Sequence, residues 1–122
     1  MCLIDAAAVI REVGGGDIKI DFQLRNEFGS AFSAQGCSAR MAIADWLYRD
    51  TNIHSYNGSI VKDENGIYSI ASFNIPGTDT VNLRGAYVYQ VSIRDILGNL
   101  EPPFQGKLII SQSADISFAQ GG

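Results

Sequence analysis

Strict alternation of apolar and polar residues defines the clearest element of the sequence, residues 17–25. Four apolar side chains are separated by single polar ones: Ile18, Ile20, Phe22 and Leu24. A period of two places all four on one face of a β-strand, whereas a helix would spread them around its surface. The segment therefore predicts a strand with one face in a core. A polar turn containing glycine follows at residues 26–30.

A second alternating segment spans residues 85–94 and is rich in residues that favour strands. One face carries the large apolar side chains Tyr87, Tyr89, Val91 and Ile93. Residues 95–99 predict the turn that ends this strand. Pro102 and Pro103 enforce an extended connection, and residues 104–111 then predict another strand.

Residues 63–66, with the sequence Asp-Glu-Asn-Gly, predict a hairpin turn. Asn-Gly between two strand-like runs, here residues 59–62 and 67–73, is a strong short-range hairpin signal. Residues 78–83 predict a short helical turn that crosses the end of the sheet.

Two segments are less regular. Residues 37–45 alternate in the manner of a strand, and we interpret them as one, although their alanines also favour a helix. Residues 2–13 fit either a strand or a short helix through the alanines at positions 6–8. The three glycines at positions 14–16 end either structure.

The pattern as a whole predicts an all-β fold. It contains about seven strands separated by turn signals at intervals of roughly 8 to 15 residues, without a long amphipathic helix. This favours a single antiparallel β-sandwich over a parallel βαβ arrangement. We expect residues 1–15 to form an N-terminal arm or first strand, residues 16–117 the sandwich, and residues 118–122 a flexible tail.

Gly85 and Tyr87 indicate that the predicted sandwich is of the immunoglobulin-like type. They follow the Gly-x-Tyr pattern of the tyrosine corner, in which a phenol hydroxyl bonds back to the chain at the edge of a sandwich. We therefore expect these two residues to define the fold rather than to bind a ligand.

Composition and charge limit the partners. The chain has 122 residues, 46% of them hydrophobic, which suffices for one domain with its own core. The formal net charge is -4, and the nine Lys and Arg residues stand singly along the sequence. Phosphate neutralisation requires a basic stripe, so nucleic acid is not an expected partner. No run reaches the roughly 18 to 20 apolar residues of a membrane span, and a membrane partner is not expected either.

Residues with reactive side chains are few. Cys2 and Cys37 do not form a spaced disulfide framework, although one bridge between them remains conceivable. Two thiols and one histidine do not make a four-ligand zinc site without carboxylates. The single histidine, His54, falls in a loop or edge strand, where a solvated role is the default. We expect no catalytic residue, metal or cofactor, and hence a non-enzymatic protein.

Several aromatic residues fall in segments that resemble loops, among them Phe28, Phe32, Trp46, Tyr48 and Tyr56. Trp46, Tyr48 and Tyr56 are the candidates for contacting a partner protein or for stacking on a sugar ring. Packing in the core or along an edge is the alternative, with Trp46 capping the sandwich.

The order of the motifs resembles a known family. A Gly-Asp pair at residues 16–17 opens the first strong strand, and an x-x-x-Gly turn follows at residues 26–29. The Gly-x-Tyr-x-Tyr strand begins at Gly85, and a Gly-x-Leu-x-Ile strand begins at Gly106. Over residues 16–117 this order is similar to the immunoglobulin-like domains of tailed-phage virion proteins, including the N-terminal domain of baseplate upper proteins.

The resemblance implies a structural component of a bacteriophage or prophage particle, located in the virion. Such a protein would act as a baseplate or tail adaptor or as a capsid decoration. It would dock through sheet edges and loops onto other virion proteins, with multiple copies in a symmetric assembly. The alternative hypothesis is a carbohydrate-binding β-sandwich that uses the exposed aromatics Trp46, Tyr48 and Tyr56.

Overall fold

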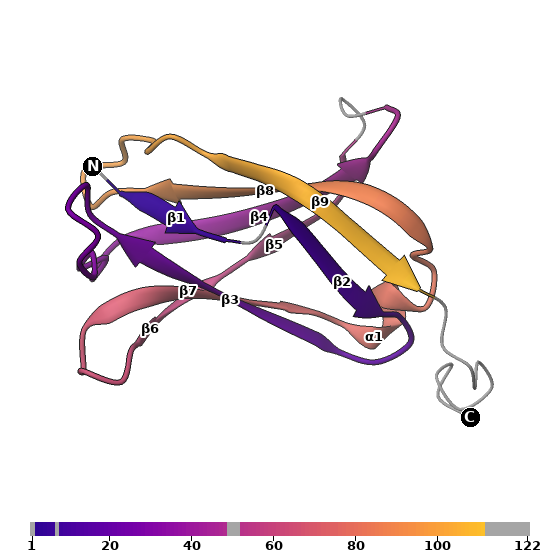
Figure 1. The fold of residues 1–122 in the computed structure, drawn as a ribbon, viewed down its shortest axis with the longest axis horizontal. Helices are drawn as coiled ribbons and strands as arrows, with labels where there is room; N and C mark the ends of the chain where they lie inside the picture. Colours follow the sequence, from indigo (N-terminus) through magenta and orange to yellow (C-terminus); the bar gives the residue numbers. More distant parts are fainter. Residues whose placement is uncertain (1, 7, 49–51, 112–122) are drawn as a thin grey trace.

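Two β-sheets packed face to face make up residues 2–6, 8–48 and 52–111, the part of the chain that the computed structural model describes, without side chains at 52 and 53 (Figure 1). The four-stranded sheet has the order β1 (Leu3–Asp5), β3 (Ile18–Arg25), β7 (Tyr68–Ile75), β6 (Ser59–Lys62). The five-stranded sheet has the order β2 (Val9–Val13), β9 (Phe104–Ser111), β8 (Gly85–Arg94), β4 (Ser38–Asp45), β5 (Asn52–Asn57). A helix of one turn, α1 (Gly77–Thr80), lies between β7 and β8. The predicted all-β sandwich is confirmed.

The described residues contain nine strands, where the sequence predicted about seven, because two segments each form a pair of strands. The N-terminal segment gives β1 to one sheet, antiparallel to β3, and β2 to the other, parallel to β9. Residues 52–62 likewise change sheets at Gly58, between β5 and β6. A Cβ atom at Gly58 would lie 2.6 Å from the Phe73 ring, so the crossing favours glycine. The sandwich is therefore antiparallel except for the β2–β9 pair.

Residues 3–5 and 9–13 are strands of the sandwich and form neither a helix nor a free arm. Ile4 and Ile10 are partly buried and pack against the core, whereas Val9 and Val13 face outward and are 43% and 61% exposed. Because this alternation is weak and the edge strands are short, the sequence of this segment fits a helix as well as a strand. The sandwich begins before residue 16, the boundary that the sequence predicted. The predicted tail and the last six residues of the predicted domain lie outside the described residues.

Alternating strands supply the core as predicted. The inward side chains of β3, β4 and β8 are almost completely buried: Ile18, Ile20, Phe22, Leu24, Ala39, Met41, Ile43, Tyr87, Tyr89, Val91 and Ile93. Phe22 lies at the centre, with its ring 5.8 Å from those of both Phe73 and Tyr89. Gly106 of β9 makes room for this cluster, because a Cβ atom there would lie 2.6 Å from the Tyr89 ring.

Gly85 and Tyr87 form the corner at the start of β8. The Tyr87 hydroxyl donates to the carbonyl of Arg84 at 2.9 Å and accepts from its N–H at 2.7 Å. Gly85 has a φ of +97°, a left-handed conformation that side chains disfavour. The loop before β8 is thus tied to the strand that follows it.

A buried threonine joins two loops at the end of the sandwich that carries α1, on the right in Figure 1. Thr80 is 0% exposed; its Oγ1 donates to the Gly16 carbonyl at 2.7 Å and accepts from the Gly15 N–H at 3.0 Å. Asp17 accepts a further bond from the Gly77 N–H at 2.7 Å. These contacts hold the turn between β2 and β3 against α1.

No helix in the described part of the chain is long and apolar enough to cross a membrane.

Candidate functional site

Three turns of the same construction lie at one end of the sandwich, on the left in Figure 1. Each starts at Asn or Asp and reaches a glycine three residues later: residues 26–29, 63–66 and 95–98. The side-chain oxygen of the first residue accepts from the N–H groups two and four residues later, at 2.8 to 3.1 Å. The glycines have φ angles of +83°, +81° and +87°, which explains their placement. We call loops 26–37, 63–66 and 95–103 together the loop-bearing end.

Arginines brace two of the three turns. Arg25 donates to the Gly29 carbonyl at 3.0 Å, and Arg94 donates to the Gly98 carbonyl at 2.8 Å. Each arginine directly precedes the first residue of its turn and also forms a β-bridge across it. A turn that is fixed in this way has little freedom left to lose on binding, so its tip is suited to recognition.

The tips of two turns hold apolar side chains in solvent. Phe28 is 84% exposed, Ile96 76% and Leu97 83%, and Leu100 beside them is 54% exposed. A Cβ atom at Gly36 would lie 3.1 Å from the Ile96 side chain, so loops 26–37 and 95–103 are neighbours. Single exposed apolar residues are ordinary, but several on adjoining loops are typical of an interaction surface.

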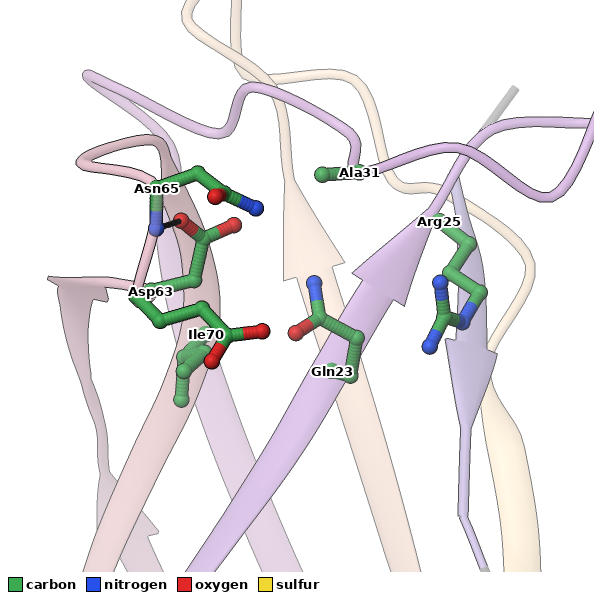
Figure 2. A pocket seen from close by; sticks show the side chains of 7 residues that line it. Gln23, Arg25, Ala31, Asp63, Asn65 and Ile70 are labelled. Atoms are coloured by element: carbon green, nitrogen blue, oxygen red, sulfur yellow. Dashed lines mark hydrogen bonds between the residues drawn. The ribbon is translucent and has the colours of Figure 1, made fainter.

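A polar hollow of about 410 Å³ lies beside these tips, on the outer face of the four-stranded sheet. Figure 2 shows it between Asp63 and Asn65 of the β6–β7 turn and Gln23 and Arg25 at the end of β3. Arg25 is ion-paired with Asp5, at 3.0 Å between Nε and Oδ2. The hollow therefore has charged groups of both signs.

The polar groups around this hollow are engaged with one another. The Ser69 hydroxyl, which is fully buried, donates to Asp63 Oδ2 at 2.6 Å and accepts from Gln23 Nε2 at 2.8 Å. The bond from Ser69 holds the pKa of the Asp63 carboxyl below its usual value, with help from the Ile67 and Asn65 N–H groups. Ser69 is thus a structural hydroxyl that fixes the β6–β7 turn.

Two of the three predicted aromatic contacts, Trp46 and Tyr56, lie on opposite faces of one sheet. Tyr56 of edge strand β5 pairs in register with the fully buried Met41, so it faces the inside of the sandwich. Trp46 lies on the outer face of the same sheet, with the Lys107 ammonium 4.7 Å from its ring centre. Tyr48 is 67% exposed. The structure therefore separates Tyr56 from Trp46, and Trp46 covers a sheet face rather than the end of the sandwich.

His54 lies on β5 near α1. Its Nδ1 is 3.8 Å from Asp79 Oδ2, and the same oxygen accepts a hydrogen bond from the Tyr56 hydroxyl at 2.8 Å. Burial, followed by the interaction with Asp79, raises the pKa of the Tyr56 hydroxyl, so it stays protonated as a donor. Of the two positions that the sequence left open for His54, a loop or an edge strand, the structure shows the edge strand.

Cys2 and Cys37 are both free thiols. Burial raises the pKa of the Cys2 thiol to about 11, with Glu101 and Cys37 as smaller causes. Burial also raises the pKa of the Cys37 thiol, and Asp95 adds to the effect. Since the thiolate is the nucleophile, the raised pKa values lower the reactivity of both thiols at neutral pH.

Within the described residues, no group of three or more His, Cys, Asp or Glu side chains could hold a metal ion.

The apolar tips were only partly found from the sequence, because Phe28 was noted as an aromatic in a loop whereas residues 95–99 were read as a turn alone. The available signal was the pair Ile96-Leu97 between Asp95 and Gly98, since two bulky apolar residues at the centre of a turn cannot both enter a core.

Solved structures share this architecture. The chain is similar to the fibronectin(III)-like modules of CbhA from Clostridium thermocellum, with 13% identity, coverage of 93% of this chain and 99% of that chain, and a TM-score of 0.51. It is also similar to the filamin domain of Lin-41 (18% identity, 88% and 90% coverage, TM-score 0.46) and to murine CRIg (12%, 93% and 98%, 0.43). No protein-family model and no curated protein matches the chain. The fold is an immunoglobulin-like β-sandwich, and the likenesses show the fold alone.

Proposed function

We propose that this chain is a non-enzymatic structural domain that docks onto a partner protein through its loop-bearing end. The observation that carries the proposal is the exposure of Phe28, Ile96 and Leu97 on two turns that are fixed by their own hydrogen bonds. A sandwich is a rigid scaffold, and binding residues are commonly found on loops that such a scaffold positions.

The energetics favour this end for docking. Transferring an exposed Phe or Leu side chain into an interface contributes about 1.5 to 3 kcal/mol. Because the turns are already ordered, the entropy lost on association is smaller than for a flexible loop. A few residues supply most of the affinity in protein interfaces, so a small cluster of this kind suffices for docking.

The proposed setting is a bacteriophage or prophage particle, where the domain is a baseplate or tail adaptor or a capsid decoration present in several copies. Its support is the order of the Gly-Asp, Gly-x-Tyr-x-Tyr and Gly-x-Leu-x-Ile motifs in the sequence. The carbohydrate-binding alternative gains no support from Trp46 and Tyr56, which lie on opposite faces of one sheet.

The test is to purify particles from the cells that encode this chain and to quantify the chain in them by mass spectrometry. A glycan array with the purified protein is run in parallel. We expect a constant number of copies per particle and no glycan binding. Absence of the chain from every particle fraction would overturn the virion setting, and glycan binding that is lost in Tyr48→Ala would favour the carbohydrate alternative.

A further inference from the structure

A second hollow, of about 370 Å³, lies on the outer face of the five-stranded sheet next to the loop-bearing end. Strands β4, β5 and β8 and the loop after β8 line it with seven residues: Ser38, Ala39, Arg40, Asn57, Ser92, Arg94 and Leu100. We call it the arginine hollow. Its polar side chains can all donate hydrogen bonds, and none of the seven is Asp or Glu.

The strand register gathers these donors. Arg40 of β4 pairs with Ser92 on one side and with Asn57 on the other, and Ser38 pairs with Arg94. Directly paired residues face the same side of a sheet, and residues two apart on one strand do so as well. Arg40 and Arg94 are therefore diagonal neighbours on one face, flanked by two hydroxyls and an amide.

Two positive charges line this hollow, and none of its seven lining residues supplies a counter-charge. Within the described residues, the Arg40 guanidinium has no hydrogen bond or ion pair, and it is exposed. Arg94 uses one N–H for the Gly98 carbonyl, which leaves the other donors of its guanidinium available. Two guanidinium groups on neighbouring positions of one face repel each other, and an anion bound to both would offset this repulsion.

The overall charge limits what that anion is. With a net charge of -4, the protein repels a polyanion such as nucleic acid at long range, and it has no basic stripe along which a phosphate backbone could run. A short segment with only a few carboxylates is repelled much less than a polyanion. Leu100, which is 54% exposed, adds an apolar wall beside the two arginines.

We propose that the arginine hollow binds a short acidic segment of a partner protein, with carboxylates on Arg40 and Arg94 and an apolar side chain on Leu100. This inference rests on the proposed function and gives the chemistry of the partner segment that lies beside the apolar tips. Arginine is suited to the role because its planar guanidinium can hold a carboxylate through two parallel hydrogen bonds.

The test is an amide NMR titration of the purified protein with a capped peptide in which two glutamates flank a leucine. We expect shifts confined to residues around Ser92, Asn57 and Arg94, which weaken as salt is added. Arg40→Gln should bind at least about tenfold more weakly, since hydrogen bonds to charged groups are strong. Arg40 is the residue of choice because its side chain makes no bond with the rest of the described structure that the fold would lose.

Arg11→Gln is the matched control, because Arg11 is an exposed arginine on the same sheet, but on β2 at the opposite edge. It should bind the peptide like wild type, and a peptide with glutamine in place of glutamate should not bind. Equal binding by Arg40→Gln and Arg11→Gln, or equal binding of the glutamine peptide, would overturn the proposal. So would binding of inorganic phosphate with none of the peptide. Because the titration uses purified protein, its result is independent of whether the chain is found in particles.

Discussion

The Tyr87 hydroxyl makes two hydrogen bonds with the backbone of Arg84, one to its carbonyl at 2.9 Å and one from its N–H at 2.7 Å. A single side chain thus satisfies both backbone groups of a residue three positions earlier. The ring itself is 8% exposed and belongs to the core. The corner therefore couples the geometry of the loop to the packing of the sandwich.

Tyr87→Phe should destabilise the fold by about 1 to 2 kcal/mol. The ring stays in the core, but two hydrogen bonds are lost, and each contributes roughly 0.5 to 1.5 kcal/mol net. Urea unfolding measures the change. Tyr48→Phe, at an exposed tyrosine, should change stability by less than about 0.5 kcal/mol. Equal effects of the two substitutions would show that the corner contributes no stability.

Gly14→Ala should lower stability by about 1 to 3 kcal/mol, because the new Cβ atom would lie 2.6 Å from the Thr80 carbonyl oxygen. Two positions on, a Cβ atom at Gly16 would meet nothing within 4 Å. Gly16→Ala should therefore leave stability unchanged or raise it slightly, because alanine lowers the conformational entropy of the unfolded chain. Thermal unfolding of the two variants compares one close contact with open space within the same turn. Tolerance of alanine at both positions would contradict the packing of this turn on α1.

Thr80→Val keeps the shape of a buried side chain and removes its hydroxyl, which bonds to both Gly15 and Gly16. We expect a loss of about 1 to 3 kcal/mol, because two hydrogen bonds are lost and each contributes roughly 0.5 to 1.5 kcal/mol net. Thr78→Val is the control on the exposed side of the same helix. Hydrogen exchange at the Gly15 amide should increase in Thr80→Val alone, and unchanged protection there would count against the contact.

Alkaline pH should weaken the fold through Cys2. Burial raises the pKa of this thiol from 9.0 to about 11, so above pH 9 the unfolded chain releases a proton that the folded chain retains. The free energy of unfolding should therefore fall as the pH rises from 9 to about 11, by up to about 3 kcal/mol. Lysines and tyrosines titrate in the same range, so the measurement is the difference between wild type and Cys2→Ala. Parallel pH profiles of the two proteins would contradict the shift.

Local pattern was enough to find the strands that bury one face. The 85–94 and 104–111 predictions coincide with β8 and β9, because 85–94 alternates over its full length and both segments lie beside strong turn residues. Pairing partners are not encoded locally, so the parallel contact of β2 with β9 was not predictable. Thr80 was missed for a related reason, since a threonine in a short helical turn looks solvated until the glycine turn packs on it.

The candidate site depended on tertiary structure in the same way. Each of the three turns at Asn26, Asp63 and Asp95 was recognisable from its own residues. Their position at the same end of the molecule depends on how the strands are arranged in the two sheets. The sequence groups Trp46 with Tyr56 because both are aromatic residues in segments that resemble loops. Only the register with Met41 and the contact with Lys107 show that they lie on opposite faces.

Incorporation of tip variants into particles tests the central claim most directly. Phe28→Ser combined with Leu97→Ser removes the two most exposed apolar tip side chains without touching the hydrogen bonds that fix their turns. Val13→Ser is the matched control. Val13 is an exposed valine at the last position of β2, next to the turn that packs on α1. Each variant is first shown to fold by circular dichroism and urea unfolding, and its copies per purified particle are then counted by mass spectrometry. The account predicts that the double variant is lost from particles while Val13→Ser is retained like wild type. Retention of the double variant at the wild-type copy number would contradict docking through the loop-bearing end.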